Sequence, residues 1–204
     1  MQFFSVSLFG VRAVAVLPFL LMGCTITHTI QSSDIPSLQI GSPLRSIKPK
    51  TFAFKEFRDI RGSDPLWAGT VMNHEYKLEK PVTLAVGTAI RKELERNGHI
   101  CIDYSEQAKA DFIIEGVVVK YYLHLEPGVS IVIPPRVFAF VVVKLTVSNT
   151  YPDRGILSKV YEGNGQARGI APAIGTPLVS LSQAQMAMLK EMSTDIELIA
   201  FLEK

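Results

Sequence analysis

The residue types that usually carry catalysis or bind metals are scattered along this chain. None of its four histidines forms a pair at metal-ligand spacing. His74-Glu75 lacks the second histidine of a zinc-protease helix, and Gly163-Asn164-Gly165 falls inside an expected strand instead of before a phosphate-binding helix. No serine occupies a Gly-x-Ser-x-Gly turn. The sequence therefore predicts no metal site, no catalytic site and no dissociable cofactor, which favours a protein that is not an enzyme.

The best polar cluster consists of Asp59, Arg61 and Asp64, at the start of the segment 59–80. This segment also holds Trp67, the only tryptophan, and it is long for a connection between elements. The cluster has two interpretations: contact with a ligand or partner, or turn formation with a surface ion pair. Trp67 is a candidate partner contact.

One cysteine offers covalent chemistry of a different kind. The only charged residue among residues 1–23 is Arg12, and residues 13–22 form an apolar run of about ten residues. Such a run is too short to cross the roughly 30 Å hydrocarbon core of a bilayer as a helix, so we interpret residues 1–23 as a secretory signal peptide. The junction that follows, Leu21-Met22-Gly23-Cys24, resembles the lipobox of bacterial lipoproteins.

The lipobox resemblance implies that Cys24 is the anchoring residue. It implies cleavage before Cys24, a thioether-linked diacylglycerol on its sulfur and an N-acyl chain on its amino group. Two or more acyl chains hold a protein stably on a membrane, whereas one holds it only marginally. Thr25 follows the cysteine in place of the aspartate that is associated with retention in the inner membrane. The expected location is therefore the periplasmic face of the outer membrane.

Charge and cysteine content narrow the function classes further. The chain has 21 basic and 19 acidic residues, and loss of Arg12 with the signal peptide leaves 20 against 19. This near-neutral balance argues against a nucleic-acid-binding protein, which should carry a clear basic excess. With Cys24 lipidated, Cys101 is the only other cysteine, so no intramolecular disulfide can form. Its apolar neighbours predict a buried, inert thiol.

Hydrophobic periodicity predicts one α+β domain over residues 50–204. Residues 24–49 are rich in turn-forming residues and are expected to be a tether, with a short edge strand at 38–40. As a flexible coil, about 25 residues would span about 25 to 30 Å. Strands are expected at 51–57, 112–125, 137–148 and 157–168, and helices at 81–97 and from Ser180 or Ser182 to near the end. The order β-α-β-β-β-α predicts a two-layer sandwich, with both helices on one face of a mostly antiparallel sheet.

The two strongest strands are expected to pair as a long hairpin. In the second of them, the odd-numbered positions from Val137 to Val147 are apolar and share one face, so Phe138 and Phe140 lie on the other. The hairpin tip carries Ile131, Val132 and Ile133, which make it more apolar than an exposed loop requires. These tip residues and the two phenylalanines are candidate partner contacts.

The order of these motifs resembles the YajG-type bacterial lipoproteins. The resemblance rests on the lipobox, the segment Phe54-Lys55-Glu56-Phe57-Arg58-Asp59-Ile60-Arg61, the Pro81-Val82 helix ending at Asn97-Gly98-His99, the strand opening at Ala110-Asp111-Phe112, and the terminal amphipathic helix. It implies a small α+β sandwich in a largely uncharacterised group of outer-membrane lipoproteins. It supplies no catalytic residues, and the longer apolar hairpin tip departs from the family pattern.

Two functions remain open from the sequence. The first is a non-catalytic structural, assembly or interaction subunit of the cell envelope, anchored to the membrane by its lipid and bound to an envelope protein. The alternative is an auxiliary lipoprotein of a transport system that binds a lipid or a peptidoglycan fragment. The oligomeric state is open in both.

Overall fold

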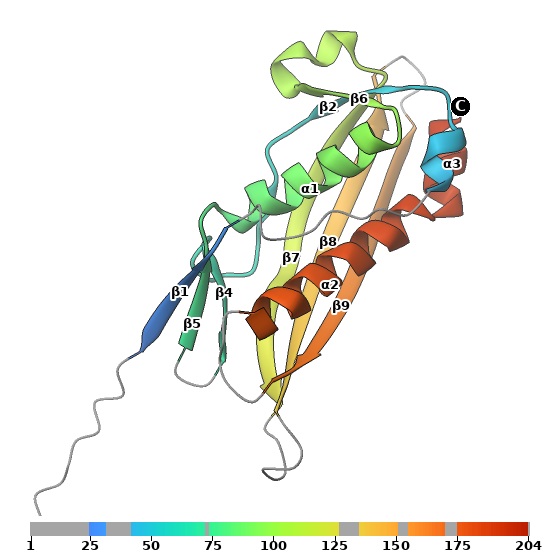
Figure 1. Cartoon of the computed structure of the whole chain (residues 1–204). Coiled ribbons are helices and arrows are strands. Elements are labelled where there is room, and N and C mark those ends of the chain that lie inside the picture. The colour runs from blue at the N-terminus through green and yellow to red at the C-terminus, as the bar shows by residue number, and fades with distance from the viewer. Residues whose placement is uncertain are drawn as a thin grey trace, which may run out of the picture.

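The computed structural model describes residues 25–31, 42–71, 74–126, 135–150, 155–169 and 175–203 (Figure 1). Within them, a nine-stranded mixed sheet is combined with three α-helices and two 3-10 helices. The strands are β1 (Ile26–Ile30), β2 (Thr51–Phe54), β3 (Arg58–Asp59), β4 (Trp67–Val71), β5 (His74–Leu78), β6 (Ile100–Asp103), β7 (Phe112–Glu126), β8 (Arg136–Asn149) and β9 (Ile156–Arg168). The α-helices are α1 (Val82–Arg96), α2 (Gly175–Ser193) and α3 (Ile196–Leu202), and the 3-10 helices are η2 (Pro43–Ser46) and η3 (Tyr104–Lys109).

Strand β7 organises the sheet because both of its edges are paired. One edge pairs with β8 along nearly its whole length, and β8 in turn pairs with β9, all antiparallel. The other edge pairs in parallel with β2, then β3, then β4. Outside these lie β6 beside β2, β5 beside β4, and β1 beside β5. The α+β class is confirmed, but the expectation of a mostly antiparallel sheet is wrong, because the sheet is mixed. The expected order β-α-β-β-β-α and its simple two-layer sandwich with two helices are also wrong, since the described residues form nine strands and three α-helices.

The long connection expected at 59–80 is a second correction, because it contains strands β4 and β5. They form an antiparallel pair with a register shift between Trp67 and Gly69. Gly69 has a positive φ of 141°, and a Cβ there would lie 2.7 Å from the Leu123 Cβ. Glycine therefore lets β4 approach β7 closely enough to join the sheet.

The expected hairpin is confirmed as β7 and β8. Along β8, every odd position from Val137 to Val147 is buried, whereas the even positions other than Val142 are half-buried or exposed. The alternation follows from the two-residue period of a strand, which points successive side chains to opposite faces.

The helices α1 and α2 lie on the same face of β7, β8 and β9 (Figure 1). Helix α1 was expected at these residues, with Pro81 just before it and Arg96 in its last turn. The expected terminal helix instead begins earlier, at Gly175, and is divided into α2 and α3. Asp195 starts the second piece, because its side chain accepts a hydrogen bond from the Glu197 N–H at 2.9 Å.

Glycines in β9 allow unusually close packing of α2. A Cβ at Gly163 would lie 1.8 Å from the Ala184 carbonyl oxygen, and one at Gly165 would lie 1.9 Å from that of Ser180. Side chains of α2 also accept hydrogen bonds from the β9 backbone: Glu191 from the Glu162 N–H and Gln183 from the Gln166 N–H. The Gly163-Asn164-Gly165 run therefore serves helix packing, and α2 covers this edge of the sheet.

Two parts of the expected tether at 24–49, strand β1 and the 3-10 helix η2, belong to the folded body. Strand β1 adds to the sheet beside β5, with Ile30 1% exposed, and η2 buries Leu44. The short edge strand expected at 38–40 lies outside the described residues.

Candidate functional site

Arg61 is the centre of the polar cluster at the start of the segment 59–80. Its Nε and Nη2 donate to both carboxylate oxygens of Asp59 at 2.7 to 3.1 Å. Its Nη1 donates to the carbonyl oxygens of Trp67 at 2.7 Å and Tyr121 at 3.1 Å. The Arg61 and Asp59 side chains are only 6% and 15% exposed. Arg61 therefore ties β3 and β4 to the middle of β7.

Asp64 completes this cluster on its outer side. Its carboxylate accepts from the Leu66 N–H at 2.9 Å and from Lys77 Nζ at 3.2 Å, which stabilises the turn before β4. The hydrogen bond from Arg61 holds the pKa of Asp59 below its ordinary value, although burial opposes this effect. All these donors and acceptors are partnered within the fold, so the arrangement supports the structural interpretation of the cluster.

The structure places Trp67 in β4 and leaves it half-buried. Its backbone carbonyl is used by Arg61. As a partner contact, Trp67 stays a prediction, and it is separated from the phenylalanines of β8 by β7.

The outer face of the β7–β8–β9 ribbon, opposite α1 and α2, carries two of the predicted partner contacts. Phe138 and Phe140 lie on it, both half-buried. Tyr122 pairs across the strands with Phe140, and their rings stack with centroids 5.1 Å apart. Val160, 50% exposed, extends the surface on β9, whereas Val142, on the same face of β8, is buried at 6% exposed. We call these five residues the outer apolar face.

Sequence reasoning found two members of the outer apolar face and missed the other three. Tyr122, Val142 and Val160 are ordinary strand residues in the sequence, and the cross-strand register alone brings them beside the phenylalanines. The other candidate contacts, Ile131, Val132 and Ile133, lie outside the described residues, as does Cys24.

A hollow of about 320 Å³ lies between the β2–β3 connection and α1. Its apolar lining includes Phe54, Phe57 and Leu84, and Leu84 is 52% exposed. Lys55 and Arg91 also line it, but both are already paired: Lys55 with Glu115, and Arg91 with Asp103. Phe57 fits against β7 because residue 116 is glycine, where a Cβ would lie 2.2 Å from the Phe57 ring.

The structure also shows where the potential metal ligands and nucleophiles lie. The part of the chain that it describes contains no group of three or more His, Cys, Asp or Glu side chains able to hold a metal ion. His28 Nε2 and His74 Nδ1 are 2.7 Å apart, a hydrogen-bonded pair between β1 and β5 that the sequence spacing did not indicate. Cys101, expected to be buried, is half-buried; its thiol donates to the Arg91 carbonyl oxygen at 3.7 Å, and desolvation raises its pKa to about 12. Such a thiol is unreactive near neutral pH.

None of the helices in the described part of the chain has both the length and the apolar character needed to cross a bilayer.

Comparison with known proteins gives a fold and no family. No family model and no curated protein matches the chain. Protein XCC0632 from Xanthomonas campestris, of the DUF330 family, has a TM-score of 0.57 at 9% identity, over 81% of this chain and 92% of that one. The hypothetical protein CT253 from Chlamydia trachomatis has a TM-score of 0.44 at 10% identity, over 76% and 96%. A lipoprotein candidate from Caulobacter crescentus has a TM-score of 0.38 at 12% identity, over 78% of this chain and 91% of that one. At these identities the likeness to XCC0632 shows a shared fold, and the two weaker likenesses carry no argument.

Proposed function

We propose that this chain is a non-catalytic lipoprotein of the cell envelope that binds a protein partner through the outer apolar face. The observation that carries the proposal is this face itself: a stacked aromatic pair and two valines on the side of the ribbon away from α1 and α2. Exposed apolar patches commonly mark interaction sites, and aromatic residues are enriched in protein–protein interfaces. The lipobox at Cys24 supplies the location, and the YajG-type resemblance is consistent with both.

The lipid anchor has a direct test. Replacing Cys24 with alanine removes the sulfur that would carry the diacylglycerol, so the variant should leave the membrane fraction and appear in the soluble periplasmic fraction. Its circular dichroism spectrum should match that of the body of the wild-type protein. A variant that still sediments with membranes would overturn the lipid anchor. With Cys24 intact, Thr25→Asp should move the protein to the inner membrane if the expected outer-membrane location is right.

The partner surface is tested by photo-crosslinking in intact cells. A photoreactive amino acid at Val160 lies on the outer apolar face, and the same amino acid at Lys92 lies on the exposed side of α1 as a matched control. We expect a discrete protein adduct from position 160 and none from position 92. Adding Phe140→Ser should remove that adduct, because it takes away half of the stacked pair. An adduct that survives this substitution, or that forms equally at both positions, would contradict the proposed surface.

The hollow beside α1 favours a second candidate function, a carrier of a lipid or a peptidoglycan fragment. Its apolar lining could receive an acyl chain. Gly87 lines this hollow, and a Cβ there would lie 3.8 Å from the Phe57 ring, so Gly87→Leu should fill it, whereas Gly87→Ala should not. Native mass spectrometry of protein from envelope extracts should show a bound species that Gly87→Leu removes. An empty protein under every extraction condition would exclude this function.

A further inference from the structure

The strand register brings six strand ends to one end of the molecule. Ile26 of β1 pairs with His74 of β5, and His74 pairs with Val71 of β4. On the other side of the sheet, Leu125 of β7 pairs with Val137 of β8, which pairs with Ala167 of β9. The pairing of Gly69 in β4 with Leu123 in β7 joins the two rows. We call this end, defined by these paired residues, the proximal end.

Strand β1 is fixed to the body at the proximal end. All five of its residues pair in parallel with β5. The His28 ring stacks on the rings of His74 and Tyr76 with centroids 5.0 and 5.1 Å apart, and Ile30 is buried in the core. The Glu79 N–H adds a hydrogen bond to the Ile30 carbonyl at 2.9 Å. An edge strand held by a ladder, a ring stack and a core side chain moves with the sheet.

The candidate lipid attachment point therefore lies very close to the folded body. Cys24 precedes Ile26, the first residue of β1, by two positions. Two residues reach at most about 7 Å. A flexible tether of residues 24–49 would instead span about 25 to 30 Å. Whatever holds Cys24 also holds the proximal end.

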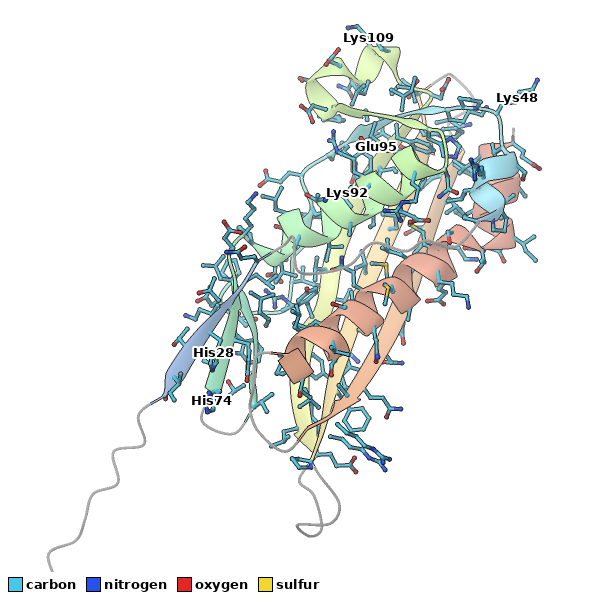
Figure 2. The ribbon with its side chains drawn as sticks, viewed as in Figure 1. His28, Lys48, His74, Lys92, Glu95 and Lys109 are labelled. Atoms are coloured by element: carbon cyan, nitrogen blue, oxygen red, sulfur yellow. The ribbon has the colours of Figure 1, made fainter. Side chains whose placement is uncertain are left out.

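We propose that the proximal end sits directly on the phospholipid surface, with β7, β8 and β9 leading away from it. This inference rests on the proposed lipid at Cys24. Arg136 and Arg168, paired across β8 and β9 at this end, are suited to contact lipid phosphates. The 15-residue strand β7 extends about 50 Å, so the opposite end lies on that order of distance from the membrane. The histidine pair lies toward the proximal end, and Lys48 and Lys109 lie at the opposite end (Figure 2).

This orientation also bears on the partner surface. The outer apolar face runs along β7, β8 and β9, so in this arrangement it stands away from the bilayer plane. It would then be open to a periplasmic partner and not covered by lipid. Only its Phe138 end would approach the headgroups, because Phe138 is one residue from Val137 of the proximal end.

Fluorescence quenching on vesicles tests the orientation. The full lipidated protein, with Cys101→Ser, receives a single fluorophore through Gln166→Cys near the proximal end or through Lys109→Cys at the opposite end. It is reconstituted into phosphatidylethanolamine and phosphatidylglycerol vesicles that contain a lipid with a nitroxide headgroup. We expect quenching at position 166 to be several-fold stronger than at position 109, and Lys48→Cys should behave like position 109.

Two results distinguish a wrong orientation from a missing lipid anchor. Equal quenching at positions 166 and 109 in protein that floats with the vesicles would overturn the orientation but leave the lipid anchor standing. Protein that does not float with the vesicles would overturn the anchor and the orientation together. A 20-residue glycine-serine insertion between Thr25 and Ile26 is the matched control: flotation should persist, and the difference between the two positions should disappear.

Discussion

Arg61 is predicted to be the most important polar side chain for the stability of the described fold. Arg61→Ala removes a paired guanidinium and leaves the Asp59 carboxylate, 15% exposed, without its charged partner, although the backbone N–H of residue 61 can still donate to it. It also removes the donor to the Trp67 and Tyr121 carbonyls. Breaking a buried ion pair by removing one member costs about 3 to 5 kcal/mol. Because Asp59 keeps some access to water, we expect the lower end, a loss of about 3 kcal/mol in the free energy of unfolding.

Urea denaturation provides the measurement, and Trp67 provides the signal. It is the only tryptophan, and its own carbonyl accepts from Arg61, so its fluorescence reports the region that the substitution changes. Arg58→Ala, at the exposed neighbouring position in β3, is the matched control and should change stability by about 0.5 kcal/mol or less. The stability of Arg61→Lys should lie between those of the wild-type protein and Arg61→Ala, since lysine keeps the charge but lacks the planar guanidinium that meets both carboxylate oxygens.

The ion pair also predicts a pH dependence. The pKa of Asp59 is lowered in the folded protein, so its contribution is present above the ordinary carboxylate value of 3.8 and is lost as the pH falls through the folded value. Arg61→Ala should therefore flatten the stability profile on the acid side of about pH 4. In a double-mutant cycle with Asp59→Asn, the coupling energy should exceed about 1 kcal/mol. A loss below about 1 kcal/mol for Arg61→Ala, or a coupling near zero, would refute the structural role of the pair.

Three other predictions concern packing, an unpaired hydroxyl and the internal cysteine. Gly163→Ala should lower the free energy of unfolding, measured in urea, by about 3 kcal/mol or more, because its Cβ would lie 1.8 Å from the Ala184 carbonyl oxygen. Gly175→Ala is the control and should change stability little, because a Cβ there meets open space. Similar losses for both variants would contradict the packing argument. Tyr121→Phe should raise thermal stability by about 1 kcal/mol, since the buried Tyr121 hydroxyl has no hydrogen-bond partner among the described residues, and a loss of stability would show that it has one. Cys101 should react with a thiol reagent at pH 8 only after unfolding in urea, as burial raises its pKa to about 12; equal rates in folded and unfolded protein would refute its protection.

Part of the candidate site could be predicted because its signals are local. The alternation from Val137 to Val147 assigned Phe138 and Phe140 to the opposite face, and the structure places them there. The cluster of Asp59, Arg61 and Asp64 was also identified, but its role was not. Whether Arg61 meets a ligand or the Tyr121 carbonyl depends on a strand that begins more than fifty residues later, and no local pattern contains that information.

The sequence by itself determined only those features whose signal lies within a short stretch of the chain. The lipobox at Cys24 predicts an anchor, the period of α1 and of the long hairpin strands predicts those elements, and the scattered histidines predict no metal site. Each depends on residues within a few positions of one another, where side-chain direction follows directly from the backbone period.

Only the tertiary structure decided which strands meet and which edge of the sheet β1 joins. Strands β1, β4 and β5 have five residues each, too few to display a clear alternation, and they gain their hydrogen bonds from partners distant in the chain. Gly163 and Gly165 look like defects in a strand until α2 packs on them. The pairing of β1 with β5 likewise places residues 26–30 of the expected tether in the sheet, because their β-branched residues suit a strand and Ile30 is buried in the core.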